Sequence, residues 1–329
     1  MAFTLFPRRN KVVNLVFNDH SIRYVEVKQT NPPQPQRWGE RLLPSGIIAE
    51  GRIADAETLG NILEECLDEW KIQKREVRFL VPDSFVIIRK VSIPADVKDD
   101  EVDGYLYLEL GSTIHLPFEE PVFDVLVLSE KDNKKQVLVF AAPEKLVTDY
   151  SELLSDHKLK PIAADISPLA LHRLYVKQDR SRMGERLLTI QFDLQMVTLC
   201  VFEKDIPIFM RHIPVEIDGN WDIKLGKSGV HELDYIGDRE ELNYQFEDIY
   251  KDINKFIDFD RYSLNQAEQG LNRILLNGDH PMLGDILPEL KNRFNLPVDT
   301  LHIRQADSGK DEFKRSHYLA LGLGLKEGK

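Results

Sequence analysis

VVNLVFNDHSIRYVEV, residues 12–27, consists of two apolar runs joined by a short polar turn at Asn18-Asp19. Runs rich in Val, Ile and Phe on both sides of such a turn predict a β-hairpin. LLTIQFDLQMVTLCVF, residues 187–202, repeats the pattern, and a third strand is predicted at residues 208–213. Because the same unit opens both halves of the chain, the sequence predicts an α/β fold with two duplicated lobes.

Amphipathic helices are predicted between and after these hairpins, with apolar stripes that face the core. The predicted helices begin at or near Asp55, Pro143, Ser167, Asp238 and Leu283. The helix after Asp238 is the longest, with an apolar stripe from Leu242 to Ile257, and it is expected to stop near Gly270. Asp238 and Glu241 together resemble a capping box, in which both side chains bind free backbone amides of the first turn.

Residues 85–166 follow a different pattern from the hairpins. In order they read strand, helix, strand, strand, helix, strand, which predicts a compact α+β unit inserted into the first lobe. The predicted boundaries are 1–84 plus 161–186 for the first lobe, 85–160 for the inserted subdomain and 187–329 for the second lobe. Because the insertion departs from the two-lobe plan, we expect it to be the platform for a partner.

The composition disfavours several classes of function. The 329 residues carry 43 basic and 55 acidic side chains, and the formal net charge of −12 repels nucleic acids and anionic lipid headgroups. Cys66 and Cys200 lie in apolar stretches and predict buried thiols in a reducing compartment, not a disulfide or a metal site. No apolar run approaches the roughly 20 residues of a membrane span. We therefore expect a cytoplasmic protein with no direct membrane insertion.

Four strings stand out along the chain: LPSGIIAEGRIAD (43–55), VPDSFVIIR (81–89), HLPFEEPVFD (115–124) and RILLNG (273–278). Taken in this order, they resemble the PilM family of type IV pilus assembly proteins. Their glycines and prolines have ordinary roles in turns, so the resemblance is what adds a function. It implies an actin-like (ribonuclease H-like) two-lobe fold with an inserted subdomain similar to that of FtsA.

An actin-like ATPase holds phosphates and Mg²⁺ with two hairpin turns and a later glycine-rich loop. The resemblance places eight residues at these positions: Val16, Asn18, Arg23, Gln191, Asp193, Gly278, Asp279 and His280. Val16 and Gln191 stand where the carboxylates belong, and Asp193 stands where a phosphate-facing glycine belongs. Asp279 and His280 replace the next glycines of the third loop. These departures imply a degenerate nucleotide site, no ATP or Mg²⁺ cofactor and no catalytic residue.

Two hypotheses of different classes follow. In the first, the protein is a scaffold at the inner face of the cell membrane that binds the cytoplasmic N-terminal tail of a PilN-type bitopic membrane protein. It would link this partner to other pilus components, including the motor ATPase. In the second, the chain is an atypical actin-like ATP-binding protein or ATPase, with Asp193 or Asp279 recruited to Mg²⁺. A melting temperature that rises with Mg-ATP would distinguish the second from the first.

The tail of such a partner would be an extended apolar peptide, which a groove in the inserted subdomain could receive by backbone pairing and side-chain pockets. The residues predicted to line this groove are Ile93, Leu106, Tyr107, Leu116 and Phe118. The alternative for each is an ordinary place in the core of the subdomain. No metal-binding site is predicted.

Overall fold

The computed structural model describes residues 12–178, 180–182, 184–216, 220–225, 231–264, 270–303 and 313–327. The chain divides into two compact units. The first consists of Met1–Val81, Thr148–Gln178 and Ile303–Lys329, and the second of Pro82–Val147 and Asp179–His302. Each unit is built around a five-stranded sheet, and the second also contains a small three-stranded sheet.

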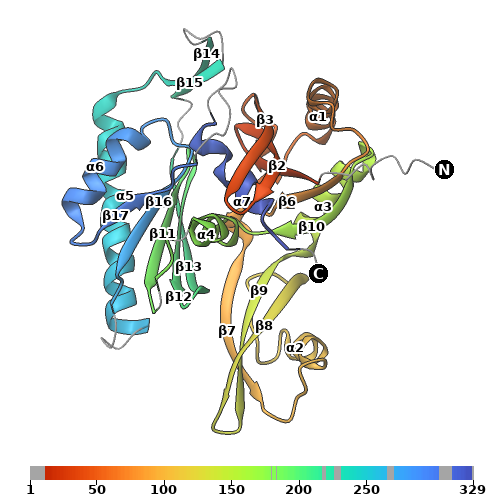
Figure 1. The fold of residues 1–329 in the computed structure, drawn as a ribbon, viewed down its shortest axis with the longest axis vertical. Coiled ribbons are helices and arrows are strands. Elements are labelled where there is room, and N and C mark those ends of the chain that lie inside the picture. Colours follow the sequence, from red (N-terminus) through yellow and green to blue (C-terminus); the bar gives the residue numbers. More distant parts are fainter. Residues whose placement is uncertain are drawn as a thin grey trace, which may run out of the picture. The chain divides into compact units, whose positions relative to one another are not determined.

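The sheet of the first unit has the order β10-β6-β1-β2-β3 (Figure 1). Its strands are β1 (Val13–Asn18), β2 (Ser21–Thr30), β3 (Pro33–Leu42), β6 (Glu76–Leu80) and β10 (Lys160–Asp165). The first three strands are antiparallel, β6 runs parallel to β1, and β10 runs parallel to β6. The hairpin predicted at residues 12–27 is therefore confirmed. Its side chains on β1 are buried because both faces of the sheet carry helices.

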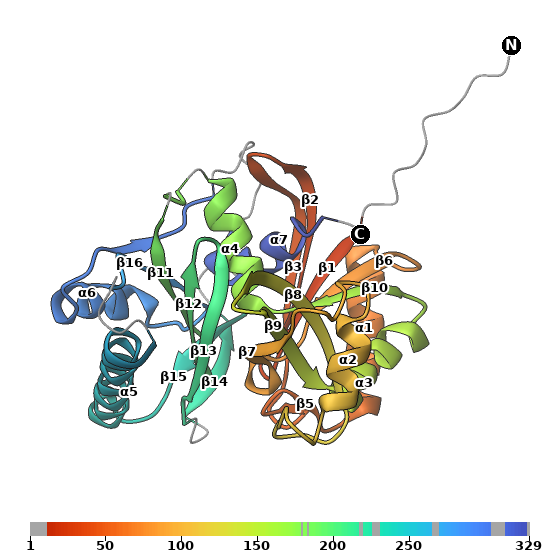
Figure 2. The same ribbon diagram turned by 90° about the horizontal axis from the view of Figure 1, so that it is seen from below.

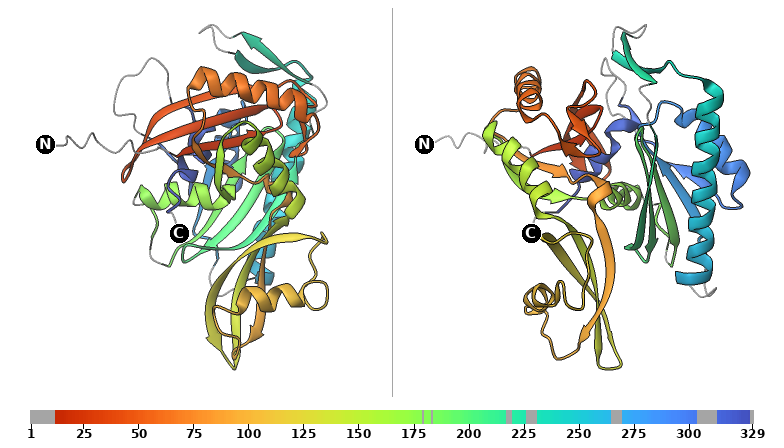
Figure 3. Two further views of the ribbon diagram at one scale, coloured as in Figure 1. Left: turned by 90° about the vertical axis from the view of Figure 1, so that its right-hand side faces the viewer. Right: turned by 180° about the vertical axis from the view of Figure 1, so that it is seen from behind.

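The helices of the first unit are α1 (Ala56–Trp70), α3 (Glu144–Asp156), α4 (Ser167–Lys177) and α7 (Tyr318–Leu323), and β4 (Ile48–Ala49) pairs with β5 (Arg52–Ile53) before α1. α1 and α3 lie on one face of the sheet, and α4 and α7 lie on the other (Figure 1 and Figure 3). Asp55 caps α1 as predicted, because its carboxylate accepts the Thr58 amide at 3.0 Å. Cys66 on α1 is buried and free.

The sheet of the second unit has the order β13-β12-β11-β16-β17. Its strands are β11 (Arg186–Phe192), β12 (Met196–Glu203), β13 (Ile206–Pro214), β16 (Arg273–Asn277) and β17 (Val298–Thr300). Three antiparallel strands are again followed by two parallel ones. The two sheets therefore have the same topology, which confirms the duplication predicted from the two hairpins.

Two helices, α5 (Arg239–Phe259) and α6 (Leu283–Arg293), pack against this second sheet (Figure 2). Asp238 caps α5 as predicted, since its carboxylate accepts the Glu240 amide at 2.8 Å. A two-stranded ribbon of β14 (Trp221–Leu225) and β15 (His231–Tyr235) precedes α5. Cys200 on β12 is buried and free, like Cys66.

Residues 82–147 form the small subdomain. A 3₁₀ turn, η1 (Asp83–Phe85), leads into β7 (Ile87–Pro94), α2 (Val102–Glu109), β8 (Pro121–Lys131) and β9 (Lys134–Pro143). The sheet is antiparallel in the order β7-β9-β8. The predicted sequence of strand, helix, strand, strand is thus present, although the first strand begins two residues later than predicted.

The division of the chain differs from the predicted boundaries in several places. Residues 82–84 and the segment that follows Gln178 fall in the second unit instead of the first lobe, and the insertion shares that unit with the second lobe. Residues 148–160 belong to the first unit instead of the insertion, because the Tyr150 ring on α3 packs 5.4 Å from Phe17 and 6.4 Å from Phe79. Residues 303–329 also belong to the first unit instead of the second lobe. Their helix α7 packs so closely on α4 that a Cβ at Gly322 would lie 2.1 Å from the Ala170 carbonyl oxygen.

Candidate functional site

The turn of the first hairpin consists of Asp19 and His20, since Asn18 and Ser21 are the last paired residues of β1 and β2. The Asp19 carboxylate reaches the β4–β5 turn, where it accepts the amides of Glu50 at 2.6 Å and Gly51 at 2.9 Å. Burial raises the pKa of Asp19 above its ordinary value, against the opposing effect of these two amides. The carboxylate of this turn therefore binds the chain's own backbone.

Arg23 is the second polar group of this turn and is engaged by side chains of the same sheet. Its Nε lies 2.5 Å from Glu40 Oε1, and its Nη2 lies 3.3 Å from His20 Nε2. Its Nη1 lies 2.9 Å from the amide oxygen of Asn18 when that amide is oriented to accept. Val16, directly opposite Arg23 in the register, is buried and has no side-chain oxygen for a cation.

Two loops of the second unit meet at the carboxyl ends of β11 and β16. Asp193 follows β11, and its Oδ1 accepts Gln191 Nε2 at 2.6 Å and the Asp279 amide at 3.0 Å. Asp279 follows β16, and its Oδ1 accepts the Leu194 amide at 3.1 Å. Each carboxylate thus binds a backbone amide of the opposite loop. Asn277 completes the network by donating to Gln191 Oε1 at 2.9 Å.

Gly278 and His280 fill the remaining space of the second loop. Gly278 has a φ of 148°, and a Cβ on it would lie 1.9 Å from the Phe192 carbonyl oxygen, so only glycine fits. The His280 ring is buried, with ring centroids 5.5 Å from Phe192, 5.2 Å from Phe246 and 5.4 Å from Trp221. Its Nδ1 accepts the amide of Met282 at 3.1 Å.

The chemical consequence is that the loop amides bind acceptors within the chain. The amides of Asp193 and His280 donate to carbonyl oxygens of β12 and β11, at 3.0 and 3.2 Å, and those of Leu194 and Asp279 donate to carboxylates. A phosphate bound here would have to displace these acceptors and approach two negative charges. Within the part of the chain that the structure describes, no group of three or more His, Cys, Asp or Glu side chains could hold a metal ion.

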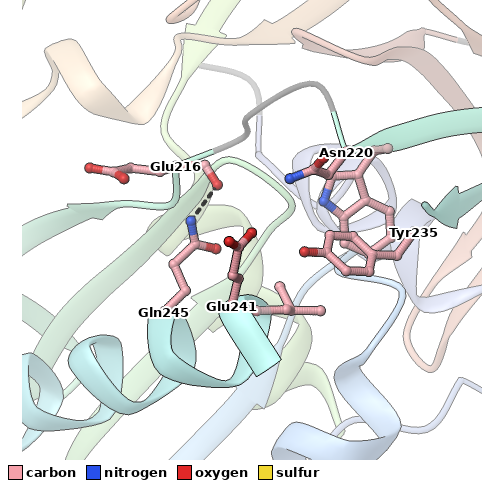
Figure 4. A pocket seen from close by; sticks show the side chains of 7 residues that line it. Glu216, Asn220, Tyr235, Glu241 and Gln245 are labelled. Carbon is pink, nitrogen blue, oxygen red and sulfur yellow. Dashed lines mark hydrogen bonds between the residues drawn. The ribbon is translucent and has the colours of Figure 1, made fainter. Parts of the chain in front are cut away.

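A small polar pocket adjoins this region at the start of α5 (Figure 4). Its lining residues are Glu216, Asn220, Trp221, Tyr235, Glu241, Leu242 and Gln245. Gln245 Nε2 donates to the Glu216 carbonyl oxygen at 2.7 Å, and the Trp221 and Tyr235 rings lie 5.1 Å apart. Sequence reasoning missed this pocket, because the ribbon of β14 and β15 that forms one wall was not predicted.

The five residues predicted to line a partner groove all lie in the small subdomain, but in different environments. Ile93 and Leu106 are 2% and 1% exposed and belong to its core, so their predicted place in a groove is corrected: they hold α2 on the sheet. Leu116 and Phe118 are half-buried against the same core. Tyr107 is 68% exposed, because it lies about 100° further around α2 than the buried Leu106.

Comparison with known proteins identifies relatives over nearly the whole chain. The family model described as type IV pilus assembly protein PilM matches residues 15–215. The solved PilM-PilN type IV pilus biogenesis complex contains a similar chain, with a TM-score of 0.77 at 20% identity, covering 96% of this chain and 98% of that one.

A second similar structure is the ethanolamine utilization protein EutJ from Carboxydothermus hydrogenoformans. Its TM-score is 0.50 at 10% identity, covering 95% of this chain and 89% of that one. These likenesses show the fold, and with the repeated sheet topology they confirm the predicted actin-like α/β class. No helix among the described residues is long and apolar enough to cross a membrane.

Proposed function

Because the chain belongs to the PilM family of type IV pilus assembly proteins, we propose that it acts as a scaffold that holds a PilN-type membrane protein, without hydrolysing ATP. The partner is suggested by the PilM-PilN complex, whose similar chain is matched almost from end to end. The scaffold would lie at the cytoplasmic face of the membrane, where the partner's tail anchors it and other pilus components join.

We propose that ATP is not hydrolysed because Asp193 and Asp279 each bind a backbone amide of the other's loop. In an actin-like ATPase the backbone amides of such loops face phosphates, whereas here the two carboxylates occupy the amides of Asp279 and Leu194. The carboxylates therefore stand in for the anion that these loops would otherwise bind. The buried Val16 and the ion pair of Arg23 with Glu40 support the same conclusion in the first unit.

The proposed binding of a partner is supported by exposed apolar side chains of the small subdomain. It exposes Tyr107 and Leu108 on α2, by 68% and 80%, and Leu116 and Phe118 remain partly accessible beside them in sequence. Exposed apolar side chains grouped on one element are typical of interaction sites. Burying two or three of them under a peptide supplies about 1.5–3 kcal/mol each before ordering costs, enough for micromolar binding.

A titration with a peptide tests this function directly. The peptide is the cytoplasmic N-terminal segment of the PilN-type protein of the same organism, and its binding to the full chain is measured by isothermal calorimetry. We expect a dissociation constant of about 1–10 μM. Phe118→Asp is expected to weaken binding, with circular dichroism showing that the variant is folded. Absence of binding by the unaltered protein would contradict the scaffold function.

A further inference from the structure

The small sheet ends on one side at β8. Among the described strands β8 pairs with β9 alone, so its other edge carries backbone groups without a strand partner. The strand is 11 residues long, and Val122 and Leu126 on one of its faces are 42% and 41% exposed. A long, apolar edge strand is a template onto which another extended chain can pair.

The Asp124–Val125 pair shows which way the backbone of this edge faces. The Glu144 amide donates to the Glu120 carbonyl oxygen at 2.8 Å, and Val125 lies opposite Val139, so Val125 falls in an alternate pair whose amide points away from β9. This amide donates to the Asp124 carboxylate at 3.1 Å. In an antiparallel strand, alternate residues present their N–H and C=O groups to the same side. The amides of Phe123 and Val127 therefore face outward together with that of Val125.

The charge around β8 indicates what kind of peptide could pair with this strand. Residues 82–147 contain thirteen acidic and seven basic side chains, which gives −6, half of the net charge of the whole chain. Residues 96–124, which include α2 and the approach to β8, contain nine acidic side chains and one basic one, Lys98. Glu119, Glu120 and Asp124 are exposed at the start of the strand. The edge is therefore apolar in its side chains and negative in its surroundings.

We propose that β8 receives the cytoplasmic tail of the membrane partner as a fourth strand, and that this tail carries Lys or Arg between its apolar residues. The inference rests on the proposed function and names the mode of binding. Side chains on one face of the added strand would lie beside Val122 and Leu126, and those on the other beside Phe123 and Val125. A basic residue next to Asp124 would draw its carboxylate away and release the Val125 amide for pairing.

A basic tail also fits a general property of membrane proteins. Segments that adjoin a membrane span on the cytoplasmic side are enriched in Lys and Arg. A second copy of this chain fits the edge less well, because β8 of that copy would bring its own Asp124, Glu119 and Glu120 against the same acidic side chains.

The test compares Val125→Pro with Val125→Ala in the full chain, using the partner's tail peptide in calorimetry. Both variants lose the isopropyl group, but only proline removes the outward N–H, and proline is tolerated on an edge strand at such a position. We expect the affinity to fall by about tenfold or more for Val125→Pro and by less than about threefold for Val125→Ala. Asp124→Asn, which keeps an acceptor for the amide, is expected to weaken binding and to reduce its dependence on salt.

A measurement on the unaltered protein does not depend on any variant folding. Binding of the peptide should slow hydrogen exchange at the amides of Phe123, Val125 and Val127. Equal affinity of both variants, with no such protection, would overturn the assignment to β8 while leaving the proposed function intact. A peptide that does not bind the unaltered protein would contradict the proposed function itself. A change in self-association for Val125→Pro, without a change in peptide affinity, would assign the edge to a second copy and overturn the inference.

Discussion

The loops of the two lobes stand on sheets with the same topology, yet they satisfy their polar groups differently. In the first unit the Asp19 carboxylate binds two amides of the neighbouring β4–β5 turn, and Arg23 forms an ion pair with Glu40 within the sheet. In the second unit Asp193 and Asp279 bind amides of each other's loops. In the first unit the turn is therefore bound to neighbouring parts of the chain, whereas in the second unit the two loops are bound to each other.

This difference shows that a duplicated fold does not fix which groups the loop amides bind. The strand order brings a hairpin turn to the same end of each sheet, but whether amides at that turn are open to an anion depends on nearby side chains. Because the second pair of loops is self-contained, a single substitution there should have larger effects than one in the first turn.

The largest loss of stability is expected from Gly278→Ala. The added Cβ would lie 1.9 Å from the Phe192 carbonyl oxygen at a φ of 148°, so the loop must shift, and we expect a loss of about 3 kcal/mol or more in the free energy of unfolding. Urea denaturation measures this loss. Gly284→Ala in α6, where a Cβ meets nothing within 4 Å, is the control and should be neutral or stabilising. Equal stability of the two variants would contradict the close packing of the loop.

A smaller loss of stability is expected when a single carboxylate is removed from either unit. Asp193→Ala leaves Gln191 Nε2 and the Asp279 amide without their acceptor, and should destabilise the protein by about 2 kcal/mol. Asp19→Ala should cost about 1 kcal/mol, because burial already disfavours the charge of that carboxylate. Asp193→Asn keeps an oxygen acceptor and serves as the control. A larger loss for Asp19→Ala than for Asp193→Ala would reverse the comparison.

The first unit has its own response to pH through His317. Burial, and then the charge of Arg23, lowers the pKa of His317 to about 4. Since the unfolded chain binds this proton first as the pH falls below about 6.5, stability is lost between that pH and 4, with about 2 kcal/mol lost by pH 5. His317→Gln should flatten the dependence of urea midpoints on pH in this range. The exposed His231→Gln is the control, and an unchanged slope in His317→Gln would refute this role.

The elements that the sequence predicted are those with a local signal. The two hairpins and the caps at Asp55 and Asp238 depend on neighbouring residues, so their patterns are readable without tertiary contacts. β3 was missed because Pro33 and Pro35 argue against a strand, although proline is tolerated here at the edge of the sheet. The sequence did not predict α7, and residues 303–329 were placed in the second lobe, since the packing of α7 on α4 leaves no local signal in the sequence.

The candidate sites were predictable in their residues but not in their contacts. The residues named in the loops lie in the paired strands close to the hairpin turns, or directly after β11 and β16. Their partners came from elsewhere: Gly51 binds Asp19 across 32 positions, and Asp279 binds Leu194 across 85. In the small subdomain an apolar side chain at Leu106 and one at Tyr107 look alike in sequence, and only the packing of α2 separates core from surface.

The melting temperature of the full chain with and without Mg-ATP separates a scaffold from an ATP-binding protein. A ligand that binds the folded state at a hundred times its dissociation constant stabilises it by about 2.7 kcal/mol, which is easily seen as a shift. We predict no shift with millimolar Mg-ATP and a clear upward shift with the partner's tail peptide, because the loop amides already bind Asp193 and Asp279. An upward shift with Mg-ATP, together with ATP hydrolysis that Asp193→Ala abolishes, would contradict the account.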